Sequence, residues 1–145
     1  MNNKFQIFAE ITKLRITIFV TVTTMFGFIA ATNSISFQIL LPALGILLLA
    51  CGSAALNHYQ ERKTDMLMER TKNRPIPSGK ISAKSTIQIS FVLVVVGSIL
   101  LFASSGLLAL SLGLLNLIWY NAVYTPLKKV SALAIIPGSL VGAIP

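Results

Sequence analysis

Two long stretches of the chain contain no charged residue. Residues 16–60 and 85–127 include no Asp, Glu, Lys or Arg. A helix needs about 20 apolar residues to cross the hydrocarbon core of a bilayer, so each stretch is long enough for two crossings and a tight turn. Polar and glycine residues at 32–34 and 104–106 mark the two turns, because backbone outside a helix needs polar partners at the membrane edge.

This pattern predicts an all-α membrane protein, a polytopic bundle of transmembrane helices. The expected spans cover residues 16–32, 37–57, 86–104 and 107–124, and a fifth begins near 130 and still runs at 145. The composition agrees, with 54% hydrophobic and 11% charged residues. No repeat or linker divides the chain, so we expect a single membrane domain over residues 1–145. Because the fifth span lacks a polar flank, we expect this domain to be the amino-terminal half of a larger bundle.

The predicted spans place all twelve basic residues on one side of the membrane. Cytoplasmic loops are enriched in Lys and Arg, so the amino terminus and residues 58–84 are expected to face the cytoplasm. The net charge of +8 then sets topology, and nucleic acid is not an expected partner. The single cysteine, Cys51, is expected to be a buried thiol in the second span, which excludes a disulfide framework.

The polar segment 57–79 carries the first candidate site. Asn57, Glu61 and Asp65 are four residues apart, so they share one face of a helix that leaves the membrane. Mg²⁺ prefers oxygen ligands and is commonly held by one or two carboxylates together with substrate phosphates. The segment also contains several bases, and the proline- and glycine-containing turn at 75–79 would fold them back toward the acids. The bases able to bind phosphate oxygens are Arg62, Arg70, Lys72 and Arg74.

A plainer interpretation of this segment is a solvated helix beside the membrane, whose charges set topology and attract anionic lipid headgroups. The position of Asn57 at the end of an apolar span argues against it, since polar groups there are costly unless they serve a function. His58 is either a base or haem ligand or, more commonly for such a residue, a hydrogen-bonding bystander.

A second candidate cluster follows the fourth span. Tyr124 and Lys128 lie at its cytoplasmic end, where they could reach the same polar region as the acids of the first site. Aromatic belts and snorkelling lysines explain such residues equally well. Arg15 and Lys13 lie on the same side at the start of the first span, where topology also explains them. Gly138 and Gly142 have the spacing that lets membrane helices approach closely.

The order and spacing of these motifs resemble the amino-terminal half of the UbiA superfamily of intramembrane prenyltransferases. The resemblance rests on Asn57-x-x-x-Glu61-x-x-x-Asp65, on the Met-x-Arg-Thr-x-x-Arg-Pro string at 68–75, on the Tyr-Thr-Pro-Leu-Lys-Lys string at 124–129, and on the Gly-x-x-x-Gly-Ala-x-Pro string at 138–145. The string at 68–75 is the most specific, and it points to the haem branch, the protoheme IX farnesyltransferases or heme O synthases.

The resemblance implies nine membrane helices around a central cavity, in the cytoplasmic (inner) membrane of a bacterium. It implies an enzyme that transfers a farnesyl group from farnesyl diphosphate to a vinyl group of haem, with Mg²⁺ as cofactor. It further implies roles for individual residues. The metal would be held through the prenyl diphosphate by Asn57, Glu61 and Asp65; the diphosphate would be bound by Arg15, Arg70, Arg74 and Tyr124; and the catalytic set would be Asn57, Glu61, Asp65 and Lys128.

Two departures from the family pattern qualify these expectations. Lys63 stands where many members carry a further acid, and the family's second acidic motif is expected beyond residue 145, so residues 1–145 alone are expected to be inactive. Two alternatives stay open: an aromatic prenyltransferase of a quinone pathway with the same fold, and a non-catalytic membrane subunit or small transporter.

Overall fold

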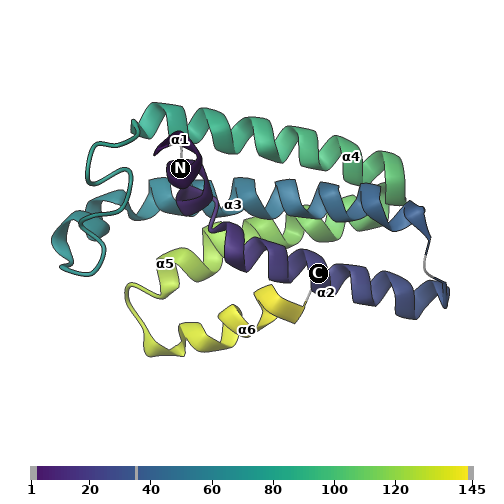
Figure 1. Cartoon of the computed structure of the whole chain (residues 1–145). Helices are drawn as coiled ribbons and strands as arrows, with labels where there is room; N and C mark the ends of the chain where they lie inside the picture. Colours follow the sequence, from purple (N-terminus) through teal and green to yellow (C-terminus); the bar gives the residue numbers. More distant parts are fainter. Residues whose placement is uncertain (1–2, 35, 144–145) are drawn as a thin grey trace.

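The computed structural model describes residues 3–34 and 36–143, and these residues are helical with short connections (Figure 1). The helices, in chain order, are α1 (Asn3–Ile11), α2 (Leu14–Thr32), α3 (Leu40–Leu67), α4 (Ala83–Ile118), α5 (Thr125–Leu127) and α6 (Ile135–Ala143). Three shorter segments join them: the 3-10 turns η1 (Phe37–Ile39) and η3 (Ala132–Ala134) and the π-helix η2 (Trp119–Tyr124). The predicted all-α class is confirmed.

Among the described residues, three helical segments are long and apolar enough to cross a membrane: Leu14–Thr32, Phe37–Leu67 and Ala83–Leu127. The third is a hairpin rather than one long helix. It reverses at Gly106, whose φ of 77° and ψ of −171° are open to glycine and strained for any other residue. The predicted turns at 32–34 and 104–106 are therefore both present, the first through left-handed backbone at Asn33.

Small residues let α3 and the first leg of α4 pack with their backbones close together. A Cβ atom placed on Gly97 would lie 2.8 Å from the backbone nitrogen of Leu49 and 2.9 Å from the carbonyl oxygen of Gly45. Two turns further along the contact, the Ser90 hydroxyl donates a hydrogen bond of 2.7 Å to the carbonyl oxygen of Gly52. This packing fixes the rotation of α3, and with it the direction in which its polar end faces.

The structure corrects two of the expected boundaries. Residues 3–11 form α1, a helix that the charge pattern did not predict, and Lys13 joins it to α2 in a left-handed conformation with φ 50°. The last helix begins at Ile135 instead of near residue 130, after the turn η3. Residues 144 and 145, the end of the predicted fifth span and of the motif at 138–145, lie outside the described residues.

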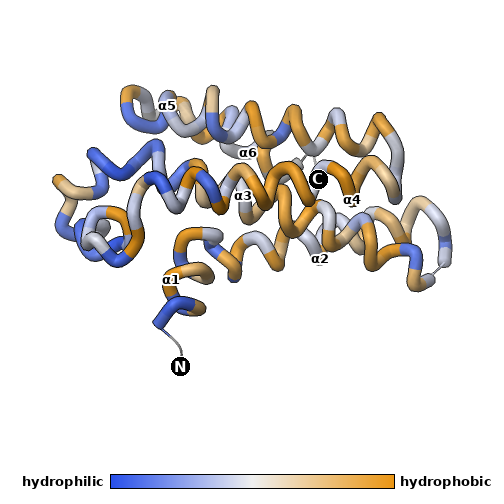
Figure 2. Tube along the Cα trace, turned by 90° about the horizontal axis from the view of Figure 1, so that it is seen from above, coloured by the Kyte–Doolittle hydropathy of each residue, from blue (hydrophilic) through white to orange (hydrophobic). Residues whose placement is uncertain are grey.

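Hydrophilic residues gather at one end of the bundle, where the α3–α4 connection and α5 lie (Figure 2). The opposite turns, at 32–34 and 104–106, contain no charged residue. The single thiol is also where the sequence placed it, since Cys51 is buried with its sulfur 3.5 Å from the hydroxyl of Thr17. The polar and charged side chains therefore cluster at one end of an otherwise apolar bundle.

Candidate active site

The acidic face of α3 is buried in the bundle. Asn57 is fully buried, and Glu61 and Asp65 are exposed by only 7% and 4%. Three polar side chains on one helical face are therefore withdrawn from bulk water, where an unpaired carboxylate would be unstable. Their burial excludes the interpretation of this face as a solvated juxtamembrane surface.

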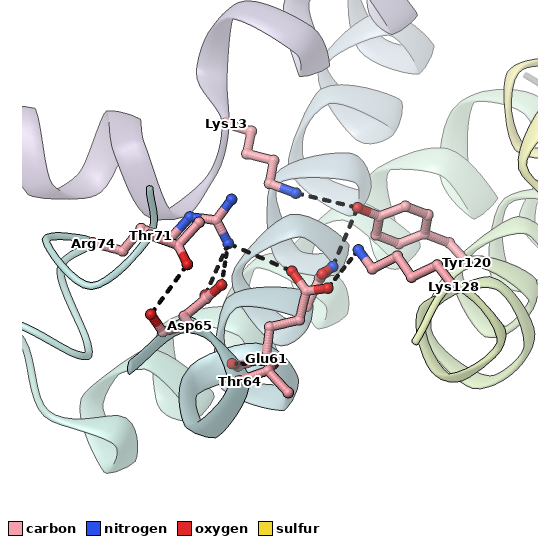
Figure 3. Close-up of polar contacts among 9 residues, drawn as sticks. Lys13, Glu61, Thr64, Asp65, Thr71, Arg74, Tyr120 and Lys128 are labelled. Atoms are coloured by element: carbon pink, nitrogen blue, oxygen red, sulfur yellow. Dashed lines mark hydrogen bonds and ion pairs between the residues drawn. The ribbon is translucent and has the colours of Figure 1, made fainter. Parts of the chain in front are cut away.

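Arg74 partners both carboxylates. Its Nη1 atom lies 2.9 and 2.8 Å from the two carboxylate oxygens of Asp65, and 3.5 Å from Oε2 of Glu61 (Figure 3). Arg74 reaches this position because the connection after α3 folds back over the end of the helix. Of the four bases expected to return to the acids, Arg74 is the one that does so among the described residues. The hydroxyl of Thr71 fastens the fold by donating to the carbonyl oxygen of Asp65 at 3.1 Å.

The second basic partner comes from a distant part of the chain. Lys128, at the end of α5, places its Nζ atom 2.5 Å from Oε1 of Glu61. The expectation that Lys128 reaches the same region as the acids is confirmed, because Lys128 forms an ion pair with Glu61. Glu61 thus connects Lys128 with Arg74, and the two carboxylates face two cations in a site whose four charges balance.

Two residues absent from the predicted site complete its wall. Tyr120, in η2, accepts hydrogen bonds at its hydroxyl oxygen from Nζ of Lys13 and from Nδ2 of Asn57, both at 3.3 Å (Figure 3). Tyr120 precedes Tyr124 by four residues and their rings stack with centroids 5.6 Å apart. The four-residue spacing between Tyr120 and Tyr124 is the one feature of the sequence that points to Tyr120 as a site residue. It does not show which of the two tyrosines faces α3.

Other predicted residues lie outside this cluster. Arg15 and Arg70 are exposed, and neither has an ion pair within the part of the chain that the structure describes. The ring of Tyr124 packs toward Gly138, where a Cβ atom would lie 2.8 Å from it, and Nζ of Lys128 lies 5.2 Å from the ring centroid. The diphosphate-binding roles of Arg15, Arg70 and Tyr124 stay predictions.

His58 is also buried, with 3% exposure, and its Nδ1 atom has no hydrogen-bond partner among the described residues. It does not belong to the ion-pair cluster. The alternatives for His58, a functional base or a buried bystander, therefore stay open.

The polar cluster described above adjoins an apolar cavity of about 610 Å³. Lys13 and Tyr120 line the cavity, so the polar bridge and the cavity share a wall. The remaining lining comes mainly from α2, α3 and both legs of α4, and it is largely apolar, with residues such as Val20, Phe28, Ile46, Leu101 and Leu112. Pockets for small molecules are typically about 300–1,000 Å³ and apolar with a few polar groups, so this cavity suits an apolar chain with a charged head.

Comparison with known proteins decides the family. Residues 19–145 match the UbiA prenyltransferase family. The chain belongs to this family. Similar curated proteins are protoheme IX farnesyltransferases from several bacteria. Those of Christiangramia forsetii, Colwellia psychrerythraea and Cytophaga hutchinsonii are 36%, 38% and 34% identical to the chain, over 95%, 94% and 100% of it.

The same alignments cover 46%, 45% and 51% of those three proteins. The chain thus spans about half the length of the curated relatives that it matches. No solved structure matches the chain.

UbiA prenyltransferases generally use a divalent metal, and the donor set on α3 fits one. Glu61 and Asp65 offer carboxylate oxygens, and Oδ1 of Asn57 is a buried acceptor without a hydrogen-bond partner among the described residues. Oxygen donors of this kind suit a hard divalent cation. Within the described residues no cluster of three or more His, Cys, Asp or Glu side chains occurs, so further oxygen ligands would have to come from substrate phosphates, water or another part of the protein.

Proposed function

We propose that the full-length gene product transfers the farnesyl group of farnesyl diphosphate to a vinyl group of protoheme and so makes heme O. The observation that carries this proposal is the cluster of the buried carboxylates Glu61 and Asp65 with Arg74 and Lys128, next to an apolar cavity whose wall includes Lys13 and Tyr120. An anionic diphosphate and an apolar prenyl chain require these two environments side by side. Haem as the acceptor is supported by the similarity to protoheme IX farnesyltransferases.

The basic side chains would bind the diphosphate. Arg74 has a planar guanidinium with several donors, a geometry that matches phosphate oxygens, and Lys128 approaches from the opposite side of Glu61. Both are held by carboxylates in this structure. As diphosphate enters, we propose that both side chains turn from the carboxylates to phosphate oxygens.

The carboxylates of Glu61 and Asp65, with Oδ1 of Asn57, would then hold Mg²⁺ against the diphosphate. When bound, the cation supplies charge stabilisation for the diphosphate as it leaves. Without a counter-charge, two buried carboxylates would repel both each other and the substrate. The acids therefore position cationic charge, and we propose no proton transfer by them.

The apolar lining would protect the reacting carbon. The bond between C1 of the farnesyl chain and the diphosphate oxygen breaks, and the electrons leave with the diphosphate. A vinyl carbon of haem captures the allylic cation, and water adds to the neighbouring carbon with loss of a proton, which gives the hydroxyethylfarnesyl side chain. Exclusion of bulk water until capture prevents hydrolysis of the cation.

We further propose that the protein lies in the bacterial cytoplasmic membrane with its charged end in the cytoplasm. All basic residues lie on the side of the α3–α4 connection, in accord with the enrichment of Lys and Arg in cytoplasmic loops.

The test of the function is direct. Membranes containing the full-length gene product are incubated with protoheme, farnesyl diphosphate and Mg²⁺, and the haems are separated and weighed by mass spectrometry. Heme O should form in proportion to the protein present. Turnover with an aromatic acid but not with haem would move the protein to a quinone pathway, and no turnover of either acceptor would contradict a prenyltransferase.

A further inference from the structure

The hydroxyl of Tyr120 connects parts of the site between which the described residues form no ion pair. The hydroxyl oxygen of Tyr120 lies 3.3 Å from Nζ of Lys13 and 3.3 Å from Nδ2 of Asn57. Lys13 belongs to the α1–α2 joint, Asn57 to α3 and Tyr120 to η2, so a single atom connects three elements at the head of the cavity (Figure 3).

In the structure the Asn57 amide donates to this hydroxyl. Nδ2 is turned toward Tyr120, and Oδ1 is left buried without a hydrogen-bond partner in the described part of the chain. A buried acceptor without a partner is costly, and the rotated amide would place an N–H donor where Oδ1 now lies. A donor there would repel a cation, whereas the oxygen can bind one.

Two local features indicate that this arrangement is specified. Lys13 adopts left-handed backbone with φ 50° and ψ 46°, and non-glycine residues held in that region cluster at functional sites. Tyr120 lies in a π-helical turn, a form that is rare and frequent at functional sites.

We propose that Tyr120 is a positioning residue that holds the Asn57 amide with its oxygen free for the cation-bound diphosphate, while it steers Lys13 to the head of the cavity. This inference rests on the proposed function, because it assigns a task to Tyr120 within the same site. Tyr120 need not touch the reacting carbon, and its effect passes through Asn57 and Lys13.

The test uses the full-length gene product in detergent and the variant Tyr120→Phe, which removes the hydroxyl and keeps the ring that stacks on Tyr124. The matched control is Tyr59→Phe, because the Tyr59 ring contacts Arg62 through its face and its hydroxyl has no hydrogen bond among the described residues. Three quantities are measured: the melting temperature, the Mg²⁺-dependent binding of farnesyl thiodiphosphate by titration calorimetry, and KM and kcat for farnesyl diphosphate.

Tyr120→Phe should weaken Mg²⁺-dependent analogue binding and raise KM for farnesyl diphosphate by about three- to tenfold, a change of the size that a hydrogen bond contributes, with a smaller change in kcat. Tyr59→Phe should leave these values within about twofold of the unmodified protein.

A second background separates positioning from packing. A carboxylate presents oxygen in either orientation, so in the Asn57→Asp background Tyr120→Phe should no longer change the Mg²⁺ dependence of binding. An equal loss in both backgrounds, or a lower melting temperature with unchanged binding, would overturn the inference, as would Tyr120→Phe behaving like Tyr59→Phe. Failure of the proposed function would instead appear in the unmodified protein, as an absence of farnesyl transfer to haem.

Discussion

Arg74 and Lys72, both in the α3–α4 connection, form ion pairs of similar length in different surroundings. Replacing each of them by methionine separates the effect of burial from the effect of charge on stability. Arg74 lies 2.8 Å from Asp65, with side chains only 22% and 6% exposed. Lys72 lies 2.6 Å from Glu69, with side chains 48% and 89% exposed. Each replacement removes one positive charge and keeps an unbranched apolar side chain.

The expected loss in the free energy of unfolding is about ten times larger for Arg74→Met than for Lys72→Met. Breaking a buried pair costs about 3–5 kcal/mol, because the remaining charge is left without compensation. Since Arg74 is partly open to water and Glu61 keeps Lys128 as a partner, we expect about 3 kcal/mol for Arg74→Met. An exposed i,i+3 pair contributes about 0.3 kcal/mol, so Lys72→Met should change stability very little.

The assay is reversible unfolding of the purified full-length protein in mixed micelles, followed by circular dichroism. Arg74→Met should unfold at a clearly lower denaturant concentration than the unmodified protein, and Lys72→Met should not. Adding Asp65→Asn to Arg74→Met should recover about half of the loss, because the uncompensated charge is removed. Equal effects of the two methionine variants, or no recovery in the double variant, would refute the reasoning from burial.

Three further predictions concern the bundle. Gly97→Ala should destabilise the protein by about 2 kcal/mol, because a Cβ atom there meets backbone atoms at 2.8 and 2.9 Å; Gly27→Ala, which meets nothing within 4 Å, should be neutral or slightly stabilising in the same unfolding assay. Gly106→Ala should cost about 1–3 kcal/mol through backbone strain alone, and a neutral result would contradict the hairpin turn. In intact cells, an impermeant maleimide should label Ser34→Cys in a variant without Cys51, whereas Ser78→Cys should react only after lysis; the opposite pattern would invert the proposed topology.

The spans and turns could be predicted because they depend on local composition. Uncharged runs of the right length, broken at 32–34 and 104–106, are sufficient to place four apolar legs. The helix α1 escaped prediction because residues 3–11 mix polar and apolar residues without a clear boundary, and the left-handed Lys13 that ends it has no signature in the sequence.

The candidate site was predictable only along α3. Four-residue spacing puts Asn57, Glu61 and Asp65 on one face whatever surrounds them. Which bases reach that face depends on the rotation of α3 and on the path of the chain between helices, and close contacts such as Gly97 against Gly45 set that rotation. For this reason Arg74 is in the cluster whereas Arg70 is exposed.

The same limit applies at the amino terminus. The side chain of Arg15 is exposed, while Lys13 reaches the wall of the site, and the diphosphate-binding role of Arg15 stays a prediction. Lys13 lies in left-handed backbone at the joint before α2, whereas Arg15 lies in the first turn of α2. Composition and charge carry no information on this change of backbone conformation.

We propose that the acids of α3 serve farnesyl transfer to haem. This role is tested by comparing heme O formation by the full-length gene product and by its Glu61→Gln and Asp65→Asn variants, each confirmed to be folded in the membrane. We expect heme O from the unmodified protein and a loss of about 100-fold or more from each variant, as for removal of a group that stabilises charge in the transition state. Heme O formation that persists at near-normal rates in both variants would contradict the account.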